Sequence, residues 1–279
     1  MDASTQAAPA SPDTDGQDAP VRGVLREFRW MALVVIAMVA VQIVLFKPFY
    51  IPSVSMMPTL ITGDRLMVAK YPYGWSWASM TPRVLPRMPG RILGALPERG
   101  DIVTAVPPHH DVDYIKRVIG LPGDTVEVAN GRLILNGVLV PSRRVGTTDF
   151  PVDSNLTCRD GEEIRYLVDT PAGKRCRMPV VRETLPNGRS YDTIDLGYER
   201  ELDDYGPVKV PPAHVFLMGD NRDQSADSRV SIRKFGLGGP VPIENVAGRA
   251  EIITFSVTGD WSLRTGRAGT GLHAARTGS

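Results

Sequence analysis

The stretch Ile51-Pro52-Ser53-Val54-Ser55-Met56-Met57-Pro58-Thr59-Leu60 comes directly after the only long apolar run of the chain, and it carries two serines at alternate positions. If the backbone before Ser55 is extended, side chains two positions apart share a face. Both hydroxyls would then point at the same bound carbonyl group. This makes Ser55 a candidate nucleophile and Ser53 a candidate hydrogen-bond donor. The alternative is that both serines serve a turn before Pro58, which is a common use of serine.

A lysine among apolar neighbours could activate that serine. It lies in Tyr114-Ile115-Lys116-Arg117-Val118-Ile119-Gly120-Leu121-Pro122-Gly123-Asp124. An alternating strand would place Lys116 on the same face as Tyr114 and Val118. Burial disfavours the ammonium form, so a lysine pKa that starts near ~10.4 can fall by several units, and the amine then becomes a general base. The alternative is a lysine on an edge strand whose charged end stays in water.

A third stretch, Gly219-Asp220-Asn221-Arg222-Asp223-Gln224-Ser225-Ala226-Asp227-Ser228-Arg229, is too polar and too rich in turn residues for a core. Alone it predicts a solvated loop. The three stretches, in this order behind an apolar run, resemble the bacterial type I signal peptidases. The segment Gly100-Asp101-Ile102-Val103 also matches the short motif that the family has between the first two, so the motifs extend over residues 51–229.

The resemblance implies a Ser-Lys mechanism in which Ser55 is the nucleophile and Lys116 its general base. It implies that Ser53 and the backbone N–H of Ser55 form an oxyanion hole, and that Ser225 orients Lys116 by a hydrogen bond. It further implies a supporting network of ion pairs, formed by Arg117, Asp220, Asp227 and Arg229. One departure from the family is Val54, where many relatives have glycine or another small residue, and this bears on the local backbone geometry.

The resemblance also implies the substrate class, which is exported preproteins that carry an N-terminal signal peptide. Shallow apolar pockets would accept small residues, chiefly alanine, at the first and third positions before the cut. The candidate lining residues are Phe49, Ile51, Pro52, Leu60 and Ile115. The extended cleavage region could add as a strand to the chain near residues 51–53 and 111–115.

The composition favours a mostly β protein. The chain of 279 residues is 42% apolar, which is enough for a sizeable core, and its 24 prolines and 27 glycines favour many short strands and turns over long helices. Asn-Gly at residues 130–131 and 136–137, between alternating runs, predicts a small meander. A net charge of +1 without a long basic block gives no indication of nucleic-acid binding.

An apolar run near the N-terminus predicts a membrane anchor. Residues 30–46 are interrupted only by Gln42, and with flanking residues they are just long enough to span a bilayer. A cleaved secretory signal is the competing interpretation, but the run is long for one and no A-x-A pattern follows it. Arg22, Arg26 and Arg29 precede the run and only Lys47 directly follows it. This asymmetry predicts a cytoplasmic N-terminus and a catalytic domain on the outer side of a bacterial inner membrane.

The expected organisation is a single transmembrane helix followed by a catalytic β domain with a second β-rich domain inserted into it. The expected segments are a disordered N-terminus at 1–21, the anchor at 22–47, the catalytic domain at 48–126 and 213–260, the inserted domain at 127–212 and a tail at 261–279, part of it disordered. Trp75 and Trp77 are expected either to contact lipid headgroups or to pack within a loop.

The remaining chemistry-bearing residues are few. Cys158 and Cys176 cannot form a zinc site by themselves, and outside the cytoplasm they could form a disulfide; the alternative is two free thiols. His109 and His110 follow Pro107-Pro108 without an obvious carboxylate partner, and His214 enters a strand, so a polar turn is favoured over a metal or a catalytic histidine. We expect no metal and no cofactor.

Three other functions compete with a signal peptidase. The residues Ser231-Ile232-Arg233-Lys234 fit the S-x-x-K motif of penicillin-recognising enzymes, but neither S-D-N nor K-T-G occurs in the chain. A non-catalytic module tethered to the membrane could bind exported chains. A self-cleaving repressor of the same clan would carry a DNA-binding helical unit, whereas this chain begins with an apolar anchor. The expected partners are therefore preproteins, the lipid bilayer and, by proximity, the export channel.

Overall fold

The structure is a computed structural model that describes residues 19–83, 86–158, 165–171 and 173–276. These residues fall into two units, one up to Ile43 and one from Val44 onward. Of the segment 1–21, which was expected to be disordered, positions 1–18 lie outside the described residues.

The first unit consists of helix α1, Ala19–Leu45, whose last residues enter the second unit. Its segment Arg26–Leu45 is long and apolar enough to cross a membrane by length and composition. The large apolar side chains of this segment are exposed, including Trp30 at 65%. A helix that is apolar all round and leaves these side chains exposed fits a membrane anchor. The helix ends before Lys47, which already belongs to a strand.

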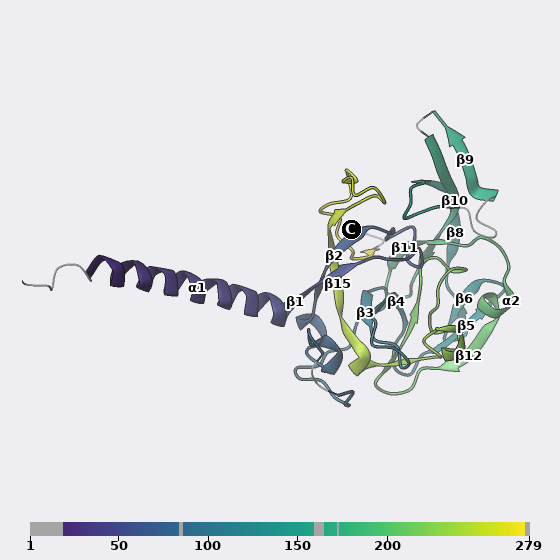
Figure 1. Cartoon of the computed structure of the whole chain (residues 1–279). Coiled ribbons are helices and arrows are strands. Elements are labelled where there is room, and N and C mark those ends of the chain that lie inside the picture. The colour runs from purple at the N-terminus through teal and green to yellow at the C-terminus, as the bar shows by residue number, and fades with distance from the viewer. Residues whose placement is uncertain (1–18, 84–85, 159–164, 172, 277–279) are drawn as a thin grey trace, which may run out of the picture. The chain divides into compact units, whose positions relative to one another are not determined.

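The second unit is built on an antiparallel sheet of seven strands in the order β1-β2-β15-β3-β4-β13-β14 (Figure 1). Their bounds are β1 Phe46–Tyr50, β2 Asp64–Ala69, β3 Ile102–Ala105, β4 Tyr114–Gly120, β13 His214–Met218, β14 Val241–Pro242 and β15 Val246–Ser256. Strand β4 lies between β3 and β13, so it is an interior strand, and all its residues after Tyr114 are buried. The sheet confirms the expectation of a mostly β protein.

Two smaller sheets complete this unit. One has the order β12-β5-β6-β7, with β5 Thr125–Ala129, β6 Arg132–Leu135, β7 Val138–Leu139 and β12 Tyr205–Lys209. The other has the order β16-β11-β10-β8, with β9 also paired to β10; the bounds are β8 Ser142–Pro151, β9 Leu167–Thr170, β10 Gly173–Thr184, β11 Arg189–Ile194 and β16 Ala275–Arg276. Strands β8, β9 and β10 form the long ribbon at the upper right of Figure 1. A short helix, α2, covers Arg200–Asp203.

The turns of the meander follow from their sequence. Asn130 and Gly131 have φ values of 49° and 73°, and Asn136 and Gly137 have φ values of 53° and 77°. Two successive residues with positive φ are what a tight hairpin turn needs, and Asn-Gly adopts that conformation at little steric cost.

The segment 127–212 is not a separate compact unit, because the whole of Val44–Ser279 clusters together. The expected boundary at residue 127 cuts through β5, which pairs with both β6 and β12. One buried cluster joins Ile119 of the large sheet and Phe216 of β13 to Val126, Leu133 and Tyr191. Apolar residues of both smaller sheets are therefore buried together with residues of the large sheet.

The described part of the expected tail packs on the second unit. Leu272 is buried with residues of the large sheet, and β16 pairs with β11. The guanidinium of Arg267 pairs with the buried carboxylate of Asp64, and that of Arg264 pairs with Asp153. The polar composition of the tail suggested disorder, but these ion pairs and one buried leucine fix it to the domain through residue 276.

Candidate active site

Ser55 lies in a turn and not in an extended strand. Strand β1 ends at Tyr50, and the turn is closed by hydrogen bonds from Met57 N to Val54 O (3.0 Å) and from Leu60 N to Met56 O (2.9 Å). The expected extended geometry is therefore wrong. The two hydroxyls nevertheless lie close together, with 3.4 Å between Ser53 Oγ and Ser55 Oγ. Ser55 is buried and Ser53 is exposed.

Lys116 reaches Ser55 from the middle of β4. Its Nζ donates to Ser55 Oγ at 2.9 Å and to the backbone oxygen of Ile115 at 3.0 Å. The residue is 4% exposed, and the ring centroid of Tyr114 lies 5.7 Å from Nζ. The alternative of a lysine that reaches water from an edge strand is therefore wrong.

Burial lowers the pKa of Lys116 from 10.5 to about 8. Desolvation is the largest cause, and the positive charge of Arg229 acts in the same direction, whereas Asp227 and Asp220 raise the pKa. A buried ammonium group loses its hydration, which disfavours the charged form. The amine is thus much easier to deprotonate than that of an ordinary lysine. The two carboxylates limit how far its pKa falls.

The expected network of four charged residues consists of two separate ion pairs. Arg117 binds Asp220 through two parallel hydrogen bonds of 2.7 and 2.6 Å, and Arg229 binds Asp227 with contacts of 3.1 and 2.9 Å. Burial alone would raise the pKa of Asp227, but Arg229 and backbone N–H groups lower it below its usual value. Removing one partner of such a buried pair costs about 3–5 kcal/mol, because the other charge is left uncompensated.

Arg117 also ties together the segments around Ser55. It donates to Gly100 O at 2.8 Å and to Thr59 Oγ1 at 3.3 Å, and Thr59 donates to Asp220 at 2.6 Å. One guanidinium therefore joins strand β4, the turn that carries Ser55 and the loop that begins at Gly219.

Ser225 does not form the expected hydrogen bond to Lys116. Its Oγ is buried and has no hydrogen-bond partner in the part of the chain that the structure describes. The hydroxyl lies against Gly219, where an added Cβ would come within 2.2 Å of it. Lys116 instead uses Ser55 Oγ and the backbone oxygen of Ile115 as acceptors.

A groove of about 340 Å³ opens at the two serines and Lys116. Three of the five expected lining residues border it, namely Phe49, Pro52 and Ile115. The other two, Ile51 and Leu60, are fully buried in the core cluster below and do not border it. Residues that sequence analysis did not assign also line it: Val112, Asp113, Tyr114, Gln224 and Ala226.

Known proteins resemble this chain over most of its length. The family model described as signal peptidase, peptidase S26, matches residues 24–255. This chain belongs to that family. A signal peptidase I from Rickettsia akari is 34% identical, with 89% of this chain and 86% of its own length aligned, and one from Rickettsia massiliae is 35% identical, with 83% and 80% aligned. A crystal structure of a signal peptidase I from Enterococcus faecalis aligns with 56% of this chain and 97% of its own at 23% identity and a TM-score of 0.29.

The peptidase S26 family identifies the chain as a serine peptidase of the class that removes signal peptides. Within the described residues, no group of three or more His, Cys, Asp or Glu side chains could hold a metal ion. His109 and His110 pack instead against aromatic rings, His110 stacking on Phe235 with 5.5 Å between centroids.

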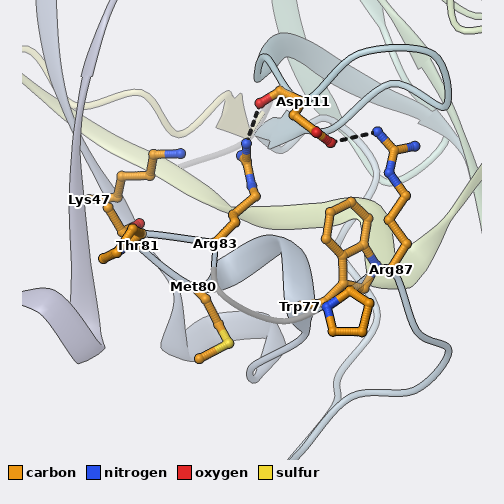
Figure 2. Close-up of a pocket in the computed structure, with 9 residues that line it drawn as sticks. Lys47, Trp77, Met80, Thr81, Arg83, Arg87 and Asp111 are labelled. Carbon is orange, nitrogen blue, oxygen red and sulfur yellow. Dashed lines mark hydrogen bonds and ion pairs between the residues drawn. The ribbon is translucent and has the colours of Figure 1, made fainter.

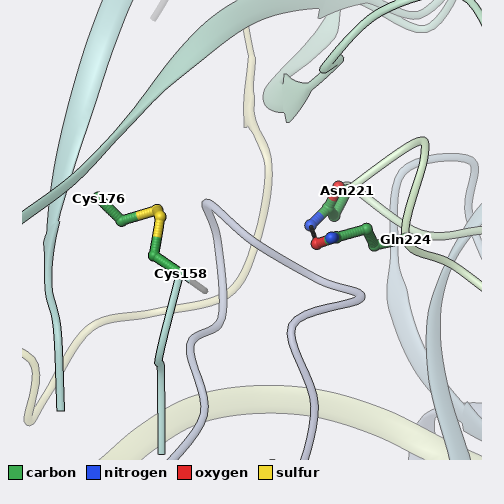
Figure 3. The surroundings of a disulfide bond; sticks show 4 residues. All are labelled: Cys158, Cys176, Asn221 and Gln224. Carbon is green, nitrogen blue, oxygen red and sulfur yellow. Dashed lines mark hydrogen bonds between the residues drawn. A yellow bond between two sulfur atoms is a disulfide. The ribbon is translucent and has the colours of Figure 1, made fainter. Parts of the chain in front are cut away.

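Asn221 is a residue beside Ser55 that sequence analysis quoted but did not assign. Its backbone N–H donates to Ser55 O at 3.1 Å, and its side chain donates to Val54 O at 3.3 Å. The side chain also donates to Gln224 at 2.9 Å, the bond that Figure 3 shows. It thus holds the two successive peptide units on either side of the Ser55 Cα. The sequence signal was an asparagine within a turn-rich stretch, and such residues often bind nearby backbone groups.

Cys158 and Cys176 form a disulfide bond, also drawn in Figure 3. The bond belongs to a buried cluster that contains Met57 and Ile194, with Val54 packed against it. Ile194 in turn forms an isolated parallel bridge with Asn221. The disulfide of this signal peptidase therefore supports both the turn that holds Ser55 and the loop that holds Asn221.

Proposed function

We propose that the protein is a membrane-bound endopeptidase that removes N-terminal signal peptides from exported preproteins through a Ser55–Lys116 dyad and an acyl-enzyme. The observation that carries this proposal is the 2.9 Å contact between Lys116 Nζ and Ser55 Oγ, with Lys116 buried and its pKa lowered to about 8. A serine hydroxyl is a weak nucleophile until a neighbouring base takes its proton, and a neutral lysine is such a base.

The chemistry proceeds in two steps. Neutral Lys116 accepts the proton of Ser55 Oγ as the oxygen attacks the scissile carbonyl, and the new ammonium group donates a proton to the leaving amine. Water then attacks the acyl-enzyme with Lys116 again acting as base. Asp227 and Asp220 favour the ammonium form that arises during each step, since both carboxylates raise the pKa of this amine.

Two donors are available for the oxyanion. The backbone N–H of Ser55 donates to no other group within the described ranges, and Ser53 Oγ lies 3.4 Å from Ser55 Oγ on the exposed side. Donors that are already fixed before the reaction stabilise a developing negative charge without a reorganisation cost. Asn221 acts as a positioning residue here, because it holds Ser55 O and Val54 O.

The substrate would lie extended along the groove. Strand β1 is at the edge of the large sheet, and residues 51–53 continue beyond it, so backbone groups near the groove can pair with an added strand. The apolar walls formed by Phe49, Pro52 and Ile115 suit small side chains such as alanine at the first and third positions before the cut.

The proposed location is the bacterial inner membrane, with a single span, the N-terminus in the cytoplasm and the catalytic unit outside near the export channel. Three arginines near the N-terminal end of the helix, before its apolar run at 30–46, support this orientation. The disulfide supports it independently, since disulfides persist in oxidising compartments outside the cytoplasm.

Cleavage of a purified preprotein tests the function. The full chain in neutral detergent should cut a preprotein that carries alanine at the first and third positions before its junction. The Ser55→Ala and Lys116→Ala variants should fold but lose cleavage by at least about 10³-fold, the scale on which dyad members contribute. Ser142→Ala and Lys174→Ala, which change exposed residues, are matched controls and should cut normally.

The outcomes separate the competing functions. Normal cleavage by Lys116→Ala would place the base elsewhere. Intact wild-type protein that binds the preprotein but never cuts it would make the chain a tethered binding module.

A further inference from the structure

A second pocket of about 460 Å³ lies outside the dyad groove (Figure 2). Its cationic lining residues are Lys47, Arg83 and Arg87, and it is also bordered by Thr81, Trp77 and Met80. We call it the cationic pocket. Among the described residues, Asp111 is the only carboxylate that borders it, and Figure 2 shows it between the two arginines.

The charges around the cationic pocket do not balance. Asp113, which lines the dyad groove, pairs with both Lys47 and Arg83, and Asp111 pairs with Arg87. Lys70 is buried next to the cationic pocket, with Nζ 3.4 Å from Thr81 Oγ1. Three cationic lining side chains thus face two carboxylates, and the two neighbouring histidines add no negative charge. Burial and, next, the charge of Lys47 lower the pKa of Lys70 to about 8, whereas Asp113 raises it.

Part of the positive charge can bind an incoming anion. The side chain of Asp111 is 81% exposed, so its pair with Arg87 is solvated and contributes little. The Nε of Arg83 is buried without a hydrogen-bond partner in the described part of the chain. Guanidinium groups bind phosphate through two parallel N–H donors, and a lysine adds a point charge.

The position of the cationic pocket in the chain indicates which kind of molecule carries the anion. Lys47 is two residues after Leu45, the last residue of the apolar helix, so its backbone is at most about 7 Å from the helix end. Trp75, which precedes the pocket residues, donates from Nε1 to Val44 O at 2.8 Å. The loop that supplies Arg83 and Arg87 continues into exposed apolar residues, which are Met88, Ile92, Leu93 and Leu96. Cations beside exposed apolar side chains at the end of a membrane span are typical of contact with lipid headgroups.

We propose that the cationic pocket binds the phosphate of an anionic phospholipid headgroup, held by Lys47, Arg83 and Arg87. The phosphate would take the place of Asp111 opposite Arg87, and the apolar side chains of Met80 and Trp77 would border the glycerol and the first methylenes. This inference uses the proposed membrane anchoring but not the peptidase chemistry. Ser55→Ala protein should therefore bind lipid as the wild type does, and failure of one proposal is distinguishable from failure of the other.

Calorimetric titration of the full chain in neutral detergent tests this site. The probes are dihexanoyl-phosphatidylglycerol, dihexanoyl-phosphatidylcholine and inorganic phosphate. The anionic lipid should bind most tightly, and its affinity should fall as salt rises. Lys47→Gln and Arg87→Gln should each weaken its binding about fivefold, the loss expected for one cation near an anionic surface. Lys174→Gln, an exposed lysine on the β8–β10 ribbon, is the matched control and should bind normally.

Several results would overturn the proposal. Equal affinity for the two lipids would show that the charge of the headgroup does not determine binding. Unchanged binding in both pocket variants, each checked for its melting temperature, would place the lipid elsewhere. If inorganic phosphate binds as tightly as the anionic lipid, the ligand is free phosphate and not a lipid headgroup, and the proposal is wrong.

Discussion

At the scale of the residue, the proposed mechanism predicts that the pKa of Lys116 sets the pH dependence of cleavage. In that mechanism the amine must be neutral to accept the proton of Ser55, and its pKa is about 8. We expect kcat/KM to rise tenfold per pH unit below pH 8 and to level off above it, since this parameter reports the free enzyme. A pH series with a soluble peptide substrate measures it. An acid limb centred near pH 6.5 would point to a histidine and contradict this assignment.

The same lysine should lower the stability of the protein at neutral pH. Burial depresses its pKa from 10.5 to about 8, so the folded state binds fewer protons than the unfolded chain between these values. The cost is present in full below pH 8 and disappears as the pH rises towards 10.5; a depression of this size corresponds to about 3 kcal/mol.

Lys116→Met should therefore be inactive but at least as stable as wild type at pH 7, by up to about 3 kcal/mol, because it removes a buried charge. The advantage should shrink towards pH 10.5. Urea unfolding at both pH values, with Lys174→Met as control, measures this difference. A large loss of stability at pH 7 would mean that Lys116 has a structural role.

At the scale of the element, the loop that begins at Gly219 must pass close to the Ser55 turn. A Cβ on Gly219 would lie 2.5 Å from Ser55 O and 2.2 Å from Ser225 Oγ. Gly219→Ala should displace the turn and lower kcat by about 10²-fold, since small misplacements of reacting groups have such effects. Gly271→Ala, where a Cβ meets nothing within 4 Å, is the control. Normal kcat in Gly219→Ala would show that the turn adapts.

The ribbon of β8, β9 and β10 depends on its disulfide for local stability. The bond joins residues 18 positions apart and packs in the cluster that contains Met57. Replacing both cysteines by alanine should cost about 3 kcal/mol in the chain-entropy account of a loop of this length. Thermal unfolding of this variant, and of wild type with and without reductant, measures the loss. Equal melting temperatures in all of these samples would contradict it.

At the scale of the whole molecule, the unit from Val44 to Ser279 contains its own core and the complete dyad. A chain that lacks residues 1–43 should therefore fold and cut a soluble peptide with a kcat/KM within about threefold of the full chain. It should cut preproteins in membrane vesicles at least about tenfold more slowly, because anchoring raises the effective concentration of enzyme at the bilayer. Equal rates in vesicles would show that the helix adds nothing to substrate encounter.

Sequence reasoning predicted the strands well where local signals were strong. Alternation around Lys116 predicted β4, and Asn-Gly at 130–131 and 136–137 predicted the meander, because side-chain period and turn chemistry are local properties. At residues 51–55 it left a strand and a turn open, and the structure has the turn at Ser55. It did not predict the ion pair that holds Arg267 of the tail to Asp64, because that partner lies about 200 residues earlier in the chain.

The sequence by itself determined the apolar helix and the mostly β class, since these follow from composition and period. The resemblance of its motifs to a known family indicated the family and the order of the motif residues. Only the tertiary structure decided which residues meet. It buried Ile51 and Leu60 under the groove, left Ser225 without a bond to Lys116, and divided four charges into two pairs. It also joined the disulfide cluster to the Ser55 turn. These are contacts between segments far apart in the chain, and their geometry depends on how the sheets pack.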